Sequence, residues 1–249
     1  IMSFEPKISL FTSVYKADQF IAHFLDDISK QTIFNECELI LINANSPDNE
    51  EDVIFPFMEK HKNVVYKRLP EDPGVYAVWN IGVKMAKSKL LSNANVDDRK
   101  HETHLEKHYN LLKQNENLDL AYADVHMSCE PNESFEQATV ISTYNFPEYS
   151  FLNLIKYNMP HNNPVWRSRI HEENGYFKED MVSAADFDMW LRAACNGSQF
   201  GRINEVLGVY YKNPNGISTK SETLQEAIAE VNRLREDYMK KVDYREFLK

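Results

Sequence analysis

The first hundred residues alternate between short apolar runs and stretches whose apolar positions recur at helical spacing. The runs lie at residues 7–14, 38–43, 64–68 and 90–91. Between the first two runs, one face of a helix is marked by Phe20, Ile21, Phe24, Leu25 and Ile28. Alternation at these lengths predicts an α/β fold, in which parallel strands and right-handed crossover helices form an open sheet with its ligand loops along one edge.

The chain beyond residue 100 is less regular. We expect a helix over 101–114, a strand over 119–125, a helix over 151–157, a strand at 164–166, a helix around 189–196 and a last strand over 206–211. Residues 126–150 are polar and show no clear period. The prediction is one domain over residues 1–218, with halves at about 7–100 and 101–218, followed by a helical tail at 219–249.

The tail is amphipathic over residues 222–248. Its apolar face is formed by Leu224, Ile228, Val231, Leu234 and Tyr238. Its polar face mixes both charge signs, whereas anionic lipid favours a mostly basic face. We therefore expect the tail to pack against the domain or to pair with a second copy as a homodimer.

Composition narrows the class of partner. The formal net charge of −10 argues against nucleic acid, whose phosphates favour basic surfaces. Cys37, Cys129 and Cys195 are far apart and form no C-x-x-C pair, so neither a disulfide framework nor a zinc knuckle is indicated. The sequence contains no transmembrane segment of roughly 20 apolar residues and no signal peptide opens it. We expect a cytoplasmic protein, with attachment to the inner face of the membrane left open.

An acidic pair follows the fourth apolar run. Asp97 and Asp98 come after Leu90 and Leu91, so their carboxylates are expected at the carboxyl edge of the sheet, where α/β folds bind ligands. Carboxylate oxygens there suit Mg²⁺ or Mn²⁺, which in turn neutralises a phosphate. An isolated acid pair is more often a solvated turn or a helix cap, so other motifs must decide.

Further motifs occur in order along the chain. Tyr15 follows the first strand, the segment N-A-N-S from residue 43 follows the second, and G-V-Y-A-V-W-N-I-G opens the third helix at residue 74. N-V-D-D at 95–98, G-Y-F at 175–177 and A-D-F-D-M-W-L-R at 185–192 come later. In this order the chain resembles, over about residues 7–218, a family 2 glycosyltransferase of the GT-A fold.

The resemblance also shows where this chain departs from the family pattern. Asn43 and Ala44 stand where that family carries two aspartates before G-S, and Asn95 takes the first place of its D-x-D metal motif. Ala185 replaces the glutamate of its E-D-x-D motif. These substitutions fall mainly on the side of the sugar donor.

The resemblance implies transfer of a sugar from a nucleoside diphosphate to an acceptor hydroxyl, with inversion at the anomeric carbon. The fold implied is a GT-A-type open, mostly parallel sheet with a Rossmann-like nucleotide-binding half and a C-terminal amphipathic helix. Residues 7–100 then form the donor half and 101–218 the acceptor half. The acceptor expected is a polysaccharide, another glycan or a lipid-linked glycan.

The resemblance also assigns roles to single residues. Asp97 and Asp98 are the expected ligands of Mn²⁺ or Mg²⁺, and Asp186 is the expected general base. The acceptor side is assigned to Asn163 and Trp166. A loop over 211–218 is interpreted as a lid, with Lys212 as countercharge to the diphosphate. Donor-binding positions are Ser13, Tyr15, Asn43, Asn45, Trp79, Asn80 and Asn95.

Some of these positions have other interpretations. Ser183 and Asp186 have nearly the spacing of a capping box, so Asp186 is a candidate both for closing the first turn of its helix and for the base. Asp188 is expected to pair with Arg192 one turn on. Three histidines lie at 101, 104 and 108 on one helix face, a spacing compatible with zinc, although a solvated face is the favoured interpretation.

Two other classes of function remain open. The substituted motifs are compatible with a non-catalytic GT-A-like domain that binds a nucleotide or a partner. A nucleotidyltransferase also combines such a sheet with a metal, but it typically needs a glycine-rich phosphate loop near the first strand. Residues 11–18 contain no glycine, so this class ranks last.

Overall fold

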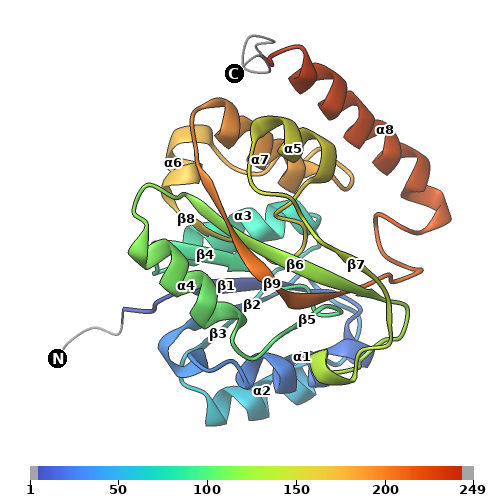
Figure 1. The fold of residues 1–249 in the computed structure, drawn as a ribbon. Coiled ribbons are helices and arrows are strands. Elements are labelled where there is room, and N and C mark those ends of the chain that lie inside the picture. Colours follow the sequence, from blue (N-terminus) through green and yellow to red (C-terminus); the bar gives the residue numbers. More distant parts are fainter. Residues whose placement is uncertain (1–4, 243–249) are drawn as a thin grey trace.

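The computed structural model describes residues 5–242, so the predicted end of the tail helix at residue 248 lies outside them. Within this range the strands form one nine-stranded sheet in the order β3-β2-β1-β4-β8-β6-β9-β5, with β7 beside β6 (Figure 1). The strands are β1 (Ser9–Val14), β2 (Glu38–Asn43), β3 (Val64–Arg68), β4 (Leu90–Asn93), β5 (Arg99–Lys100), β6 (Leu120–Ser128), β7 (Val140–Tyr144), β8 (Val165–Arg167) and β9 (Phe200–Tyr211). The helices are α1 (Asp18–Ser29), α2 (Glu51–Lys60), α3 (Val75–Met85), α4 (His104–Gln114), α5 (Phe151–Tyr157), α6 (Arg169–Asn174), α7 (Ala185–Cys195) and α8 (Ser221–Met239), with short 3-10 turns at Phe34–Glu36 and Phe135–Gln137.

The first half of the sheet is parallel, which confirms the predicted open α/β arrangement. β1 pairs in parallel with β2 and β4, and β2 with β3. The second half is mixed, because β8 runs antiparallel to both β4 and β6, whereas β6 and β9 are parallel. The carboxyl ends of β1, β2 and β4 therefore meet along one edge, as the sequence predicts.

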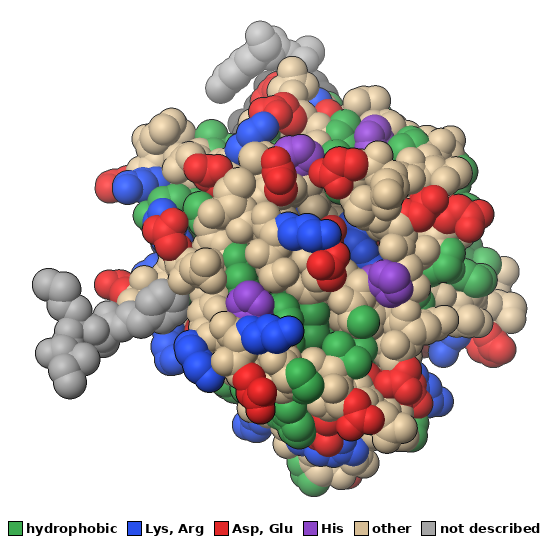
Figure 2. Space-filling view, turned by 90° about the horizontal axis from the view of Figure 1, so that it is seen from below, with side chains coloured by type: hydrophobic (Ala, Val, Ile, Leu, Met, Phe, Trp, Pro, Cys, Tyr) green, Lys and Arg blue, Asp and Glu red, His purple; other side chains and the backbone are tan. Residues whose placement is uncertain are grey.

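Each central strand is buried on both faces, which explains the continuous apolar runs. Phe11, Ile40 and Leu91 face a core formed with α3 and the helices of the second half. Leu10 and Leu39 point to the opposite face, toward α1, α2 and α4. Successive residues of one strand thus belong to two different cores. The outer surface over α1 and α2 carries acidic and basic side chains interspersed (Figure 2).

The irregular second half differs from the sequence expectation in detail. β6 and β9 are longer than predicted, and they pair from Leu120 opposite Phe200 to Ser128 opposite Tyr211. β7 lies inside the stretch that shows no period, because this strand is held by its pairing with β6 and its side chains are largely exposed. A polar residue within β6 is accommodated because Asp124 pairs with Arg202 at 2.8 Å. Long-range pairing, rather than local pattern, defines these strands.

The prediction of a solvated histidine face on α4 was wrong. His104 and His108 are fully buried, and their Nδ1 atoms contact the carbonyl oxygens of Leu207 at 3.1 Å and His104 at 2.7 Å. Burial lowers the pKa of His108 to about 3, so the ring is neutral. Within residues 5–242 the histidines at 101, 104 and 108 do not converge on a metal site.

α8 packs across α5 and α7 at one end of the molecule (Figure 1). Ala227, Leu234 and Tyr238 are buried there, whereas Ile228 on the predicted apolar face is 47% exposed, so the domain covers part of that face. None of the helices in the described part of the chain combines the length and apolar character needed to span a bilayer.

Candidate active site

A cavity of about 800 Å³ opens at the carboxyl edge of the parallel strands. It is bounded by the loops after β1 and β4, by the start of α3 and by the segment after β9. The predicted site residues that line it are Ser13, Tyr15, Trp79, Asn95, Asp97 and Asp98. Side chains from three separate motifs therefore meet in one hollow.

The loop after β1 is bent sharply at Lys16, whose backbone has a φ of 50°. This left-handed conformation is uncommon for a residue with a side chain. The Lys16 amide donates to Ser46 Oγ at 2.9 Å, which ties the bend to the loop after β2. Lys16 Nζ lies 5.4 Å from the centre of the Tyr15 ring, so an aromatic ring and a cation form one wall of the cavity.

Asp98 is the better anchored of the two adjacent aspartates. It is 5% exposed, and its Oδ1 accepts the N–H of Tyr211 at 3.0 Å while its Oδ2 accepts Asn95 Nδ2 at 2.9 Å. Asn95, which stands in the first place of the D-x-D-like motif, therefore orients Asp98. Both oxygens of Asp98 are held by the protein.

Asp97 is held more loosely, and its Oδ1 has no side-chain hydrogen-bond partner among residues 5–242. Its Oδ2 accepts Asn213 Nδ2 at 3.0 Å, and among residues 5–242 it forms no ion pair. Burial first, and repulsion from Asp98 second, raise the pKa of Asp97. A half-buried carboxylate without a cationic partner fits a hard divalent cation, which stabilises its charged form. Asp97 thus fits as a direct ligand of such a cation, and Asp98 lies next to it in the chain as a second carboxylate for the same site.

The segment after β9 closes over the acidic pair. Tyr210 and Tyr211 at the end of β9 line the cavity, as do Asn213 and most residues from there to Lys220, and Asn213 reaches Asp97 from 116 positions away in the chain. Sequence analysis places a lid here but assigns its charge to Lys212. In the structure Lys220, rather than Lys212, lines the cavity.

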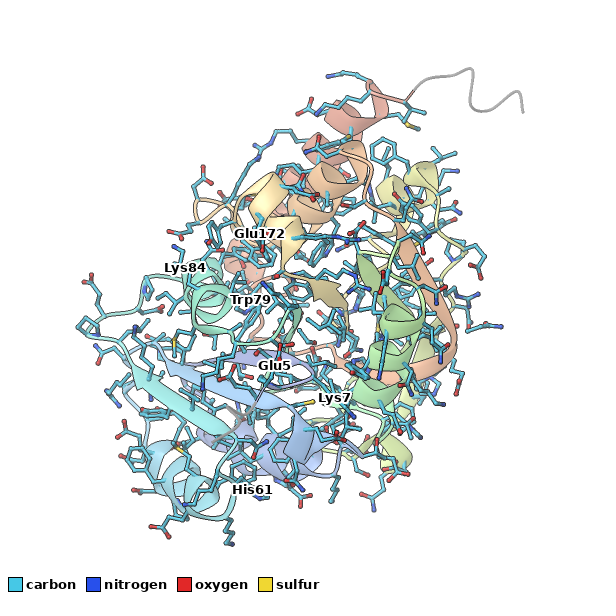
Figure 3. The ribbon with its side chains drawn as sticks, turned by 90° about the vertical axis from the view of Figure 1, so that its left-hand side faces the viewer. Glu5, Lys7, His61, Trp79, Lys84 and Glu172 are labelled. Carbon is cyan, nitrogen blue, oxygen red and sulfur yellow. The ribbon has the colours of Figure 1, made fainter. Side chains whose placement is uncertain are left out.

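Aromatic rings form the cavity floor on α3. Tyr76 and Trp79 line it, with their ring centres 5.3 Å apart and the rings nearly perpendicular. Trp79 also packs edge-to-face on Phe177, 5.5 Å away. Figure 3 shows Trp79 on α3 at the junction with the second half of the chain. Gly82 lets α3, which carries Tyr76 and Trp79, pack closely on β1, because a Cβ at Gly82 would lie 2.5 Å from the Cβ of Phe11.

Asp186 lies at the first turn of α7, just beyond the cavity lining. Ser183, three residues before it, lines the cavity, and the carboxylate of Asp186 neighbours the lining residue Tyr76. Asp186 accepts a long hydrogen bond of 3.4 Å from Asn158 Nδ2. Burial raises the pKa of Asp186 to about 6, which leaves a carboxylate available at neutral pH. Asp188 pairs with Arg192 at 2.7 Å, as predicted, and with Lys178 at 2.8 Å.

The capping-box interpretation of Ser183 and Asp186 was wrong. The residue that caps α7 is Ala184, whose methyl side chain cannot accept a hydrogen bond. The main-chain N–H groups of Val182, Ser183 and Ala184 instead donate to the carboxylate of Glu230 on α8, at 2.7, 2.9 and 3.2 Å. Asp186 is therefore not needed as the cap, although main-chain N–H groups of Phe187 and of Asp186 itself face its carboxylate.

The other predicted positions lie away from the cavity. Asn43 is buried, with Oδ1 accepting the Ser46 N–H at 2.8 Å, and Asn45 is exposed. Asn80 is buried and bonds both main-chain polar groups of Phe177. On the proposed acceptor side, Asn163 Oδ1 accepts Lys100 Nζ at 2.7 Å and Trp166 is a core residue whose Nε1 donates to His171. None of these five residues lines the cavity.

Sequence reasoning did not single out several residues of the lining. Asp72 and Val182 lie in loops that carry no ligand-binding pattern of their own. Lys220 precedes α8 and reads as an ordinary residue before a helix. In the described part of the chain, the turn residues at 213–216 are the only local pattern that predicted a role for the segment before α8 in the cavity.

The fold is an α/β fold of the GT-A type, and the cavity lies at the carboxyl edge of its parallel strands. The chain belongs to glycosyl transferase family 2, whose family model matches residues 9–174. It is 22% identical to an uncharacterized glycosyltransferase of Methanocaldococcus jannaschii, over 85% of this chain and 72% of that protein. It is 23% identical to a poly(ribitol-phosphate) beta-glucosyltransferase of Bacillus spizizenii, over 89% of this chain but 37% of that protein.

Solved structures share the fold. S. aureus TarS 1–349 in complex with UDP-GlcNAc superposes with a TM-score of 0.76 at 18% identity, over 95% of this chain and 67% of that one. The mannosyltransferase PcManGT from Pyrobaculum calidifontis, in complex with GDP-Man and Mn²⁺, gives a TM-score of 0.67 at 15% identity, over 93% of this chain and 65% of that one.

Proposed function

We propose that this chain is an inverting glycosyltransferase that moves a sugar from a nucleoside diphosphate to an acceptor hydroxyl. The observation that carries the proposal is one cavity that combines an aromatic wall, an acidic pair and two lysines, with the half-buried carboxylate of Asp186, whose pKa is raised, beside it. Family membership supports the class of reaction, and the nucleotide-sugar complexes of TarS and PcManGT support the class of donor.

The donor is bound at the edge of the parallel strands. Tyr15 and Trp79 offer aromatic faces and edges to the base or the sugar, and Ser13 and Asn95 offer polar groups to the hydroxyls. Lys16 and Lys220 supply positive charge toward the diphosphate. Asn43, Asn45 and Asn80 support the loops and helix that carry these residues rather than lining the cavity.

Asp97 and Asp98 would hold Mn²⁺ or Mg²⁺, which supplies Lewis-acid stabilisation of the leaving diphosphate when it is bound. Asp97 offers its Oδ1, and Asp98 is fixed by Asn95 and the Tyr211 amide. The presence of Mn²⁺ in the PcManGT complex supports this choice of ion.

Inversion requires the acceptor oxygen to attack from the face opposite the leaving group while it loses a proton to a base. Asp186 is proposed as that base. It lies on α7 just beyond the cavity lining, beside the lining residue Tyr76. Its pKa of about 6 keeps it ionised at neutral pH but more basic than an ordinary aspartate. The glucosyl transfer to poly(ribitol-phosphate) named for the B. spizizenii relative supports a polymeric glycan or lipid-linked acceptor.

The test is a transfer assay with UDP- and GDP-linked sugars, Mn²⁺ and a panel of glycan acceptors. We expect one donor to turn over in the native protein and transfer to fall by about 10²–10⁴-fold in Asp186→Asn. Asp180→Asn, an exposed acid shortly before α7, is the matched control and should retain activity. Nucleotide binding without turnover in any pair would favour a non-catalytic binding domain, and equal activity of both variants would exclude Asp186 as the base.

A further inference from the structure

A second cluster of carboxylates lies outside the large cavity, where the loops after β1 and β2 meet. Asp18 is the first residue of α1, and Asp48 and Glu50 precede α2. One oxygen of each lies within 4.8 Å of the oxygens offered by the other two. None of the three lines the cavity that contains Asp97 and Asp98.

Glu50 contributes to this cluster a buried carboxylate oxygen that accepts no hydrogen bond from the described residues. Its side chain is fully buried, and its Oε1 accepts the Ala17 N–H at 2.8 Å and Ser46 Oγ at 2.7 Å. Its Oε2 has no hydrogen-bond partner among the described residues. A buried carboxylate oxygen without a partner is costly, since it has lost its water and gained nothing in exchange.

No basic side chain compensates the charge of the cluster. Within residues 5–242 none of the three carboxylates pairs with a lysine or arginine. Asp18 accepts the Asn49 N–H at 3.1 Å, whereas the Asp48 carboxylate makes no hydrogen bond in this part of the chain. An unpaired buried oxygen beside two further carboxylates is an arrangement that a cation would stabilise.

The chemistry of the oxygens indicates which cation. Three carboxylate oxygens that lie within 4.8 Å of one another can share one divalent ion, and the bonds of Ca²⁺ to oxygen are about 2.3–2.6 Å long. Ca²⁺ also accepts irregular sets of carboxylates completed by water. Asp18 is exposed and Asp48 half-buried, so an ion can enter and keep waters on the open side. We propose that Asp18, Asp48 and Glu50 form a Ca²⁺ site distinct from the acidic pair in the cavity.

A cation there would join two loops that also shape the cavity. Glu50 holds the Ala17 amide and Ser46 holds the Lys16 amide, so the cluster is directly attached to the segment that carries Tyr15. Bound Ca²⁺ cross-links the starts of α1 and α2 and fixes that wall. The site itself does not depend on the chemistry proposed for the cavity.

The test is calorimetric titration of CaCl₂ into chelator-treated protein without nucleotide. We expect one Ca²⁺ per chain with a dissociation constant below about 1 mM, unchanged in Asp97→Asn and in the exposed control Asp52→Asn. Affinity should fall at least about tenfold in Asp48→Asn and in Glu50→Gln. Asp48 is accessible, so its variant should fold even if Glu50→Gln does not, and melting curves in chelator check both.

The proposal is overturned if the native protein binds no Ca²⁺ in this range. It is equally overturned if Asp48→Asn binds as tightly as Asp52→Asn, or if Asp97→Asn alone abolishes binding. Because no nucleotide or sugar is present, this result is independent of the transfer assay.

Discussion

The carboxylate of Glu230 on α8 accepts the main-chain N–H of Ser183 at 2.9 Å and so joins the C-terminal helix to the edge of the cavity. Two further N–H groups, of Val182 and Ala184, donate to the same carboxylate. A negative charge at this position also matches the positive end of α7. Since Asp186 follows within the same turn, α8 positions the proposed base although it makes no contact with the cavity described here.

Removing Glu230 should destabilise the domain. Glu230→Ala leaves three N–H groups without their charged acceptor, and we expect a loss of about 2–4 kcal/mol in the free energy of unfolding. Glu230→Gln keeps one acceptor oxygen and should lose less. Urea denaturation measures both, with Glu226→Ala on the exposed side of α8 as control. A Glu230→Ala protein as stable as the control would show that this cap contributes little.

Replacing Asp186 should raise stability as it removes activity. The pKa of its carboxyl rises from 3.8 to about 6 because burial disfavours the charged form. The folded state therefore binds the extra proton, and this group's contribution to stability falls as pH rises from about 4 to 6. Above that range ionised Asp186 costs roughly 1–3 kcal/mol. Asp186→Asn should recover that amount at pH 7.5 and little at pH 4, as measured by unfolding at both values.

The rate of transfer should rise with pH over the range in which ionisation of the Asp186 carboxyl group lowers stability. A base must be unprotonated, so kcat/KM should increase with pH through about 6 and level off above it. The profile is measured at saturating Mn²⁺, and the residual activity of Asp186→Asn should lack this limb. A native profile that is flat between pH 5 and 7.5 would contradict the assignment.

Gly82 should resist substitution even though alanine favours helices. A Cβ at this position meets the Phe11 side chain at 2.5 Å, where α3 packs directly on β1. We expect Gly82→Ala to lose about 1–3 kcal/mol, because overpacking outweighs the gain of up to about 1 kcal/mol in helix propensity. Thermal unfolding measures the change, and Lys84→Ala on the exposed side of the same helix is the control. An increase in stability for Gly82→Ala would show that Phe11 can move away.

The sequence predicted the first half of the fold because each strand and helix there has its own pattern of apolar residues. Leu10 and Phe11 belong to a continuous apolar run that is buried on both faces, and each following helix shows its own period. β7 could not be predicted in this way, since exposed Val140 and Ile141 are ordered by pairing with β6. Pairing between distant segments leaves no periodic signal in either one.

The sequence likewise predicted one part of the candidate site and not the rest. Motif order placed Asp97 and Trp79 at one edge of the sheet, but a motif does not say which way a side chain points. Trp166 therefore proved to be a core residue, and Asn80 a brace for Phe177. The Asn213 contact to Asp97 joins residues 116 positions apart, and no local pattern could have shown it.

The central claim is that this cavity binds a nucleoside diphosphate together with a metal ion at Asp97. The direct measurement is thermal unfolding with UDP, GDP, dTDP and CDP, each with Mn²⁺ or with a chelator, and with Mn²⁺ alone as reference. At a ligand concentration of about 100 times the dissociation constant, binding adds roughly 2.7 kcal/mol of stability. We predict that one nucleotide raises the midpoint beyond Mn²⁺ alone, only when Mn²⁺ is present, and that Asp97→Asn abolishes this increase. No increase with any nucleotide, or an equal increase in Asp97→Asn, would contradict it.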